Sequence, residues 1–365
     1  PQMLRHWAQT TPERVAIHQK DYGIWKPVTW GQYFERAARV GLGLRALGLT
    51  TGSHVGVISE NRIEWVLTQM GCGLTGMVTV GVYPTSPSNE VAYVVGHADI
   101  EVVICEDQEQ TDKVFDAWAE LPALRKIVVM ETKGLRSYPV AQREKIITFE
   151  ELEQLGLAGD CQQIHVTLDA QQLEEIGLMI YTSGSTGKPK GAMISYRNIR
   201  GSTIGLVDRL GLNQDTTHLS YLPLCHVAEQ LVTCFGPLYM GSQVNFGESI
   251  RTVQEDLREV APNTFLGVPR IWEKMHAAIS IKMLDAGFLQ RSLYGWALNA
   301  CRNLAEKPRS QWSFGERLAH QLSYWLVFRA LQNFLGLRLT RICLTGAAPI
   351  PPDVVRFFRV IGVPL

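Results

Sequence analysis

Short apolar runs alternate with amphipathic stretches along the first third of the chain, and this pattern predicts strands separated by helices. Apolar residues in 30–47 recur at helical spacing, and a glycine follows as a stop signal. Similar helical stretches separate the apolar runs that we predict as strands, which are 54–59, 77–82, 102–105 and 127–130. Because strands and helices alternate at short intervals, we predict an α/β fold with a parallel, doubly wound sheet.

The pattern changes near the middle of the chain, where we place a division. Residues 148–155 have the spacing of a short helix, and we interpret 158–166 as a connector. The predicted organisation is therefore a first α/β subdomain at 1–166 and a second at 167–365, with the boundary near Val166.

A polar loop between two apolar strands is the strongest candidate for a binding site. The strands are predicted at 175–181 and 191–195, and residues 183–191 include three hydroxyls, two lysines and three glycines. Glycines let backbone N–H groups point at one centre, and such a nest with added hydroxyl and ammonium groups suits a polyphosphate. The alternative is a mobile Gly/Ser surface loop, but the flanking strands and the paired lysines favour a phosphate site.

Two glycine-rich motifs invite comparison with known nucleotide-binding patterns. The loop is not a Walker motif, because Gly187-Lys188 is followed by Pro189 and Thr182 stands where the first glycine is required. Residues 71–76 spell the dinucleotide fingerprint, but a helix precedes them and a strand follows, which reverses the required order. We therefore interpret 71–76 as a packing corner between a helix and a strand.

Four segments resemble one family. Residues 181–191 read Tyr-Thr-Ser-Gly-Ser-Thr-Gly-Lys-Pro-Lys-Gly, which is the signature of adenylate-forming enzymes, the family of acyl-CoA synthetases, adenylation domains and luciferases. Residues 221–226, Tyr-Leu-Pro-Leu-Cys-His, and 345–349, Thr-Gly-Ala-Ala-Pro, are similar to the family's later motifs. The sequence Val-Pro-Arg-Ile-Trp-Glu-Lys at 268–274 resembles that of the long-chain fatty-acyl-CoA synthetase branch of the family, close to the bubblegum type. The resemblance covers nearly all of the chain.

The resemblance implies a fold, a reaction and a set of site residues. The fold is the large N-terminal domain of the adenylate-forming enzymes, with two doubly wound, mostly parallel sheets flanked by helices. The reaction activates a long-chain fatty acid with ATP and Mg²⁺ and then transfers it to coenzyme A. The implied nucleotide-binding residues are Thr182, Ser183, Gly184, Ser185, Thr186, Gly187, Lys188, Lys190, Gly346, Ala347 and Ala348. The implied catalytic residues are Lys190 and His226, and Thr182 is also implied as the hydroxyl beside magnesium.

Several polar residues near these motifs have two interpretations. Glu229 and Gln230 follow His226 on a helix start, where they either line the acyl entrance or form a solvated turn. Arg270 either meets a carboxylate or phosphate or pairs with Glu273 three residues later.

Composition excludes some functions and favours a cellular compartment. Lys and Arg together number 35, as do Asp and Glu, and this balance argues against a nucleic-acid-binding protein. The seven cysteines show no Cys-x-x-Cys pair or zinc spacing, so we expect reduced thiols and a cytoplasmic protein.

The stretch 279–336 is unusually helical and aromatic. Between Cys301 and Arg341, both ends included, Lys and Arg outnumber Glu by seven to two. We favour a core helix with solvated charges, and the alternative is a helix that lies on a membrane surface, where the protein would be peripheral.

The end of the chain leaves the activity open. The family continues with a Tyr-Gly-x-Thr-Glu segment, a barrel part and a C-terminal lid domain with a catalytic lysine, and these are absent here, so we expect a fragment with little activity alone. Three hypotheses remain: a long-chain fatty-acid–CoA ligase, an aryl-CoA ligase or carrier-protein adenylation domain, and a non-catalytic module that binds nucleotide or acyl groups.

Overall fold

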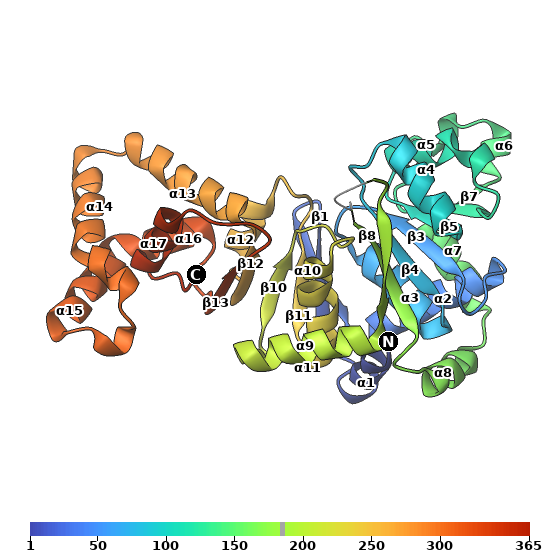
Figure 1. The fold of residues 1–365 in the computed structure, drawn as a ribbon, viewed down its shortest axis with the longest axis horizontal. Coiled ribbons are helices and arrows are strands. Elements are labelled where there is room, and N and C mark those ends of the chain that lie inside the picture. The colour runs from blue at the N-terminus through green and yellow to red at the C-terminus, as the bar shows by residue number, and fades with distance from the viewer. Residues whose placement is uncertain (183–186) are drawn as a thin grey trace. The chain divides into compact units, whose positions relative to one another are not determined.

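The computed structural model describes residues 1–182 and 187–365, and internal contacts divide the chain into two units. The first unit comprises 1–215 and 220–250, and the second comprises 216–219 and 251–365. Figure 1 shows the elements of both units, each of which is described by itself.

A seven-stranded sheet forms the centre of the first unit. The strands pair in the order β7-β6-β5-β3-β4-β8-β9, and all neighbours are parallel except β8 and β9, which are antiparallel. Their bounds are β3 His54–Ile58, β4 Val78–Val82, β5 Ile100–Cys105, β6 Lys126–Val129, β7 Ile146–Thr148, β8 Ile176–Thr182 and β9 Lys190–Ser195.

Helices cover both faces of this sheet, which confirms the predicted doubly wound architecture (Figure 1). Because successive side chains of a strand point to opposite faces, Val102 and Ile104 of β5 belong to one core and Val103 and Cys105 to another. The first core includes residues of α2 Trp30–Ala46, α3 Ile63–Thr75, α7 Phe149–Leu157 and α8 Cys161–Ala170. The second includes residues of α4 Ser88–His97 and α5 Gln108–Asp116.

The prediction of a connector at 158–166 is wrong in part, because helix α8 occupies Cys161–Ala170. The Asp160 side chain accepts a hydrogen bond from the Gln162 N–H and caps this helix, and Ile164 and Leu168 are buried. The predicted boundary near Val166 falls inside α8 and inside the first unit, since β8 pairs with β4 in the same sheet.

The glycine-rich stretch 71–76 is a packing corner, as predicted. It ends α3, where Gly76 has a φ of 75° and terminates the helix before β4. A Cβ atom on Gly71 would lie 2.8 Å from the backbone nitrogen of Gly41, so the two glycines let α2 and α3 approach closely.

A second close approach yields a stability prediction. Gly156 of α7 faces α2, and a Cβ atom there would lie 1.9 Å from the carbonyl oxygen of Arg39. We expect Gly156→Ala to lower the free energy of unfolding by about 1–3 kcal/mol, because the backbone must move to accept the methyl group. Gly201→Ala is the control: nothing lies within 4 Å of its Cβ position, so alanine should raise stability by about 0.5–1 kcal/mol. Urea unfolding of both variants measures these changes, and equal stabilities would contradict the close approach.

The first unit also contains a second, smaller sheet and further helices. In this sheet β1 Val15–Asp21 and β2 Ile24–Thr29 form an antiparallel hairpin, and β1 also pairs in parallel with β11 Gln243–Phe246. The further helices are α1 Gln2–Thr10, η1 Trp118–Glu120, η2 Leu135–Ser137, α6 Val140–Arg143, α9 Tyr196–Leu210, α10 Val227–Glu229, η3 Gln230–Phe235 and α11 Gly236–Met240. The strand β10, Thr217–Ser220, spans the chain boundary between the units.

The second unit contains a parallel pair of strands, β12 and β13, with helices around it. Its core centres on Trp272, which is fully buried, donates from Nε1 to the Gly267 carbonyl (2.9 Å) and packs edge-on against Phe265 and Phe358. Its elements are α12 Val253–Val260, β12 Thr264–Gly267, α13 Pro269–Leu284, α14 Phe288–Cys301, η4 Arg302–Glu306, η5 Arg309–Gln311, α15 Phe314–Ser323, η6 Tyr324–Phe328, α16 Arg329–Leu335, β13 Ile342–Thr345 and α17 Pro352–Val360. None of the described helices is long and apolar enough to cross a bilayer.

Candidate active site

The predicted phosphate loop joins β8 to β9 at the edge of the large sheet. Antiparallel pairing places Thr182, the last residue of β8, opposite Lys190, the first residue of β9. Both residues and Lys188 are exposed, and Gly187 has a φ of 105°, a conformation that favours glycine. The remaining predicted residues, Ser183, Gly184, Ser185 and Thr186, lie outside the described residues. The described arms of the loop thus bring one hydroxyl and two ammonium groups to one end of the hairpin.

Helix α4 supports the base of this hairpin, which sequence reasoning missed. The Tyr93 hydroxyl donates to the carbonyl of Pro189 (3.1 Å), and the Lys188 Nζ lies 5.0 Å from the centre of the Tyr93 ring. A hydrogen bond of 2.7 Å joins His97 Nδ1 and the Tyr181 hydroxyl. Burial is the main cause that raises the pKa of Tyr181 to about 12, so the phenol stays neutral. The spacing of Tyr93 and His97, four residues apart on a predicted helix, was the available signal.

His226 lies in the turn that follows β10, and it caps the short helix α10. Its own N–H donates to the Pro223 carbonyl (2.9 Å), and its Nδ1 accepts a hydrogen bond from the Ala228 N–H (3.1 Å). Because Nδ1 is an acceptor, the neutral ring carries its proton on Nε2. The side chain is exposed, so it can offer this N–H to an oxygen of a bound molecule.

The next two polar residues are buried, so the interpretation as a solvated turn is wrong. Glu229 and Gln230 are both 0% exposed. Gln230 donates to the Leu224 carbonyl (2.7 Å) and accepts from the amide of Gln69 (2.8 Å) in α3. These bonds tie the helix that carries His226 to the centre of the first unit.

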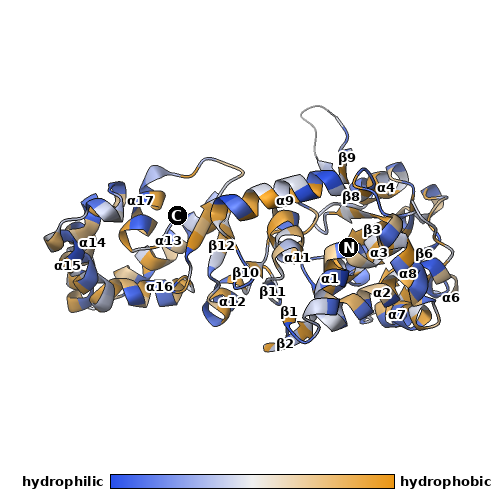
Figure 2. Ribbon diagram, turned by 90° about the horizontal axis from the view of Figure 1, so that it is seen from below, coloured by the Kyte–Doolittle hydropathy of each residue, from blue (hydrophilic) through white to orange (hydrophobic). Residues whose placement is uncertain are grey.

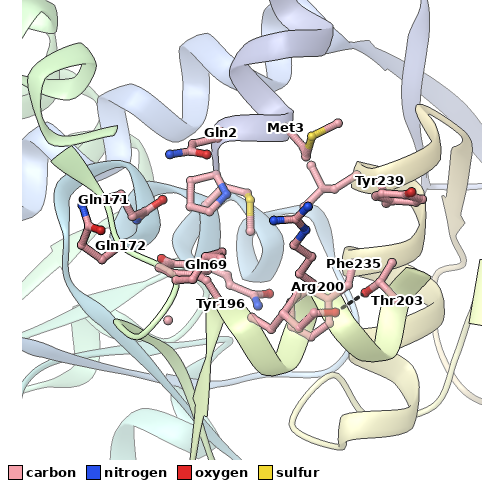
Figure 3. Close-up of a pocket in the computed structure, with 16 residues that line it drawn as sticks. Gln2, Met3, Gln69, Gln171, Gln172, Tyr196, Arg200, Thr203, Phe235 and Tyr239 are labelled. Atoms are coloured by element: carbon pink, nitrogen blue, oxygen red, sulfur yellow. Dashed lines mark hydrogen bonds between the residues drawn. The ribbon is translucent and has the colours of Figure 1, made fainter. Parts of the chain in front are cut away.

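A cavity of about 470 Å³ lies beside this helix within the first unit (Figure 3). Its wall has apolar side chains from the chain start, α3, α9, η3 and α11, among them Met3, Met70, Ile199, Phe235 and Leu238. Polar side chains line it as well, and these include Gln2, Gln171, Gln172 and Arg200. Gln69 also lines it, and because Gln69 bonds to Gln230, the cavity and the His226 helix share a wall.

The three implied nucleotide-binding residues of the second unit directly follow β13, which ends at Thr345. Gly346, Ala347 and Ala348 are exposed, and a Cβ atom on Gly346 would meet nothing within 4 Å. Ala347 has a φ of 70°, which is unfavourable for a residue with a side chain and is common at ligand sites. The small side chains leave this backbone accessible to a flat ring, as the motif implies.

Arg270 begins α13 in the same unit and is exposed. The alternative in which Arg270 pairs with Glu273 is wrong, because no ion pair joins them in the described part of the chain. Trp272, which lies between them in sequence, is buried in the core, so the motif 268–274 also helps to stabilise the fold.

The metal implied by the resemblance has few protein ligands here. Residues 1–182 and 187–365 contain no group of three or more His, Cys, Asp or Glu side chains that could hold an ion. Magnesium coordinates few protein oxygens when it also binds substrate phosphates, and Thr182 is the predicted hydroxyl that remains accessible.

Several known proteins are similar to this chain in sequence or fold. The long-chain-fatty-acid–CoA ligase ACSBG1 of Rattus norvegicus is 30% identical over 93% of this chain and 47% of its own length. The human ligase ACSBG2 is 27% identical over 100% of this chain and 54% of its own length, so the chain spans about half the length of these relatives. The crystal structure of a long-chain-fatty-acid–CoA ligase (FadD1) from Archaeoglobus fulgidus has a TM-score of 0.68 at 15% identity, over 98% of this chain and 59% of that one.

The comparison of families gives the firmest result. The pattern that describes AMP-binding enzymes matches residues 4–364, which include nearly all of both units and every predicted site residue. The chain therefore belongs to the family of AMP-binding enzymes.

Proposed function

We propose that this chain provides the nucleotide- and acyl-binding parts of a long-chain fatty-acid–CoA ligase. A carboxylate oxygen of the acid attacks the α-phosphorus of MgATP, the bond to the β-phosphate oxygen breaks, and acyl-adenylate and pyrophosphate form. The thiolate of coenzyme A then attacks the acyl carbon, and the carbon–oxygen bond to AMP breaks. The observation that carries the proposal is the β8–β9 pairing that sets Thr182 opposite Lys190 at the exposed end of a buried sheet.

The first step must bring two anions together, and the hairpin reduces their repulsion. The exposed ammonium groups of Lys188 and Lys190 neutralise phosphate charge, and the Thr182 hydroxyl can face the metal of MgATP. Tyr93 holds one arm of the loop through Pro189 before the substrate binds, so less reorganisation is needed when charge develops.

His226 acts on the acyl group. Because its Nδ1 is occupied by the Ala228 N–H, the ring offers Nε2–H and donates a hydrogen bond to the acyl carbonyl oxygen. This bond strengthens as negative charge grows on that oxygen during thiolate attack, so His226 favours the second step.

The acyl tail occupies the cavity of about 470 Å³. The apolar part of its wall suits a hydrocarbon chain, and the Gln69–Gln230 hydrogen bond links the wall to the helix that follows His226. This placement supports a long-chain acid over a small aromatic acid.

An acid-dependent exchange of pyrophosphate into ATP tests the proposal. It is run with this chain and, in parallel, with any longer polypeptide from the same gene, and the acids are palmitate, octanoate, benzoate and an amino-acid mixture. We expect palmitate to give the highest exchange rate. A preference for benzoate or for an amino acid would favour the aryl-CoA ligase or the adenylation domain, and nucleotide binding without exchange would favour the non-catalytic module.

The second unit supplies a membrane contact in this proposal. Four exposed apolar side chains, Phe314, Leu318, Leu322 and Trp325, follow one face of α15 and η6, which does not fit the favoured core-helix interpretation. Figure 2 shows hydrophobic segments beside hydrophilic ones along α14 and α15. Seven Lys and Arg against three Asp and Glu in 279–336 match the charge of anionic headgroups. The protein thus sits peripherally on the cytoplasmic side of a membrane.

Liposome flotation tests this contact. We expect the protein to float with vesicles that contain anionic lipid at low salt and to float less when Phe314→Ser and Trp325→Ser are combined, because apolar insertion is lost. Tyr22→Ser is the control, since Tyr22 is an aromatic residue 91% exposed in the first unit. Absence of flotation by the unmodified protein would remove the membrane contact.

A further inference from the structure

A buried carboxylate lies one helical turn after His226. Glu229 is 0% exposed, and its Oε1 accepts hydrogen bonds from Ser220 Oγ (2.7 Å), the Tyr221 N–H (3.2 Å) and Thr233 Oγ1 (2.7 Å). The donors lie on both sides of the turn that holds His226. One oxygen atom therefore joins the end of β10 to the helix that follows the turn.

Asn61, in the loop after β3, completes this network from another element. Its Nδ2 donates to Ser220 Oγ (2.8 Å), to the Leu222 carbonyl (2.5 Å) and, at 3.4 Å, to Glu229 Oε1. Its Oδ1 accepts from the Leu224 N–H (3.0 Å). Asn61 and Glu229 thus fix the backbone at the start and the end of the segment 220–229.

Burying the carboxyl group of this network costs free energy, which indicates that the group has a specific role. Removing a carboxyl group from water costs several kcal/mol unless hydrogen bonds replace the lost hydration. The helix also changes its winding just after Glu229: η3 is a π-helix, and the Gly236 N–H donates to Leu231, five residues earlier. Such turns are rare and cluster at functional sites.

We propose that Glu229 and Asn61 are positioning residues that hold His226 in its Nε2–H form. They act through the backbone, because the Ala228 N–H that binds Nδ1 lies immediately before Glu229, and the Pro223 carbonyl that accepts from His226 lies between the two atoms bound by Asn61. If the turn loosens, Nδ1 loses its donor and the ring is free to place its proton on either nitrogen. The inference rests on the proposed role of His226.

A double-mutant cycle in the thioester-forming assay, run on the longer polypeptide from the same gene, tests the coupling. We expect Glu229→Ala to slow acyl-CoA formation by about 10–100-fold, because a small displacement of a positioned group has an effect of this size. Glu229→Gln keeps an oxygen that can accept the same bonds, so it should keep most of the rate. If Glu229 acts through His226, adding Glu229→Ala to His226→Ala should cause no further loss.

Asp256→Ala is the matched control. Asp256 is another fully buried carboxylate, in the second unit, and it accepts from Thr252 Oγ1 (2.7 Å). Any effect of its removal should combine multiplicatively with that of His226→Ala, as expected for independent sites. Multiplicative losses for Glu229→Ala and His226→Ala would overturn the inference, whereas His226→Ala with full activity would overturn the proposed function instead.

A spectroscopic readout is independent of activity. Nitrogen-15 shifts of selectively labelled histidine report which ring nitrogen carries the proton, and the His226→Ala spectrum assigns the signal among the nine histidines. We expect the Nε2–H form in the unmodified chain and in Glu229→Gln, and a mixture of both forms in Glu229→Ala. An unchanged His226 signal in folded Glu229→Ala, with folding checked by thermal unfolding, would overturn the inference.

Discussion

Replacing Lys190 by alanine in the longer polypeptide from the same gene is expected to lower the rate of pyrophosphate exchange by about 10²–10³-fold. Lys190 is the first residue of β9 and lies opposite Thr182, so its ammonium group is at the exposed end of the hairpin where the proposed triphosphate binds. Exchange creates additional charge on the phosphate oxygens in the transition state, and a fixed ammonium group stabilises it. The loss should therefore fall on the maximal rate more than on the Michaelis constant for ATP.

The matched control is Lys133→Ala, because Lys133 is an exposed lysine of the same unit outside the hairpin. Its exchange rate should equal that of the unmodified protein. An unchanged exchange rate in Lys190→Ala would remove this residue from the mechanism. A loss confined to ATP binding would mean that Lys190 stabilises bound ATP and not the transition state.

Filling the cavity beside α9 is expected to change the preferred acid. Ile199 lines the cavity, and tryptophan at this position displaces the end of a long acyl chain. If four methylene groups lose their burial at about 0.8 kcal/mol each, affinity for the tail falls by about 3 kcal/mol, or roughly two orders of magnitude. Palmitate should lose most of its activity in Ile199→Trp, while octanoate should be affected little.

Competition between the two acids in the exchange assay measures this shift. Ser202→Trp is the control, because Ser202 is exposed on the same helix and does not line the cavity. An equal loss for palmitate and octanoate in Ile199→Trp would place the acyl tail elsewhere.

Local patterns predicted most of the secondary structure and much of the family signature. The central strands β3, β4, β5, β6 and β8 follow from short apolar runs, because buried parallel strands are apolar on both faces. The short edge strand β7, Ile146–Thr148, was not predicted, since it is only partly buried and has three residues. The fingerprint at 71–76 was rejected from the order of its neighbours, and the close contact of Gly71 with Gly41 shows why glycine is required there. The helix α8 escaped prediction because its two buried positions, Ile164 and Leu168, give only a weak periodic signal.

The supporting contacts of the site were harder to predict, since they join residues distant in sequence. Asn61 and Glu229 are 168 residues apart, and Tyr93 and Pro189 are 96 apart. No local period or motif encodes such pairs. The burial of Glu229 illustrates this limit, because a glutamate at a helix start is usually solvated and only the tertiary structure brings its donors together.

Burial also determines which nucleophiles can reach a reactive intermediate. Acyl-adenylates acylate thiolates, and Cys225 is adjacent in sequence to His226. Cys225 is only 2% exposed, and burial is the main cause that raises the pKa of its thiol to about 12. The thiol therefore stays protonated at neutral pH, so under the proposed function an acyl-adenylate would not acylate the one cysteine of this turn.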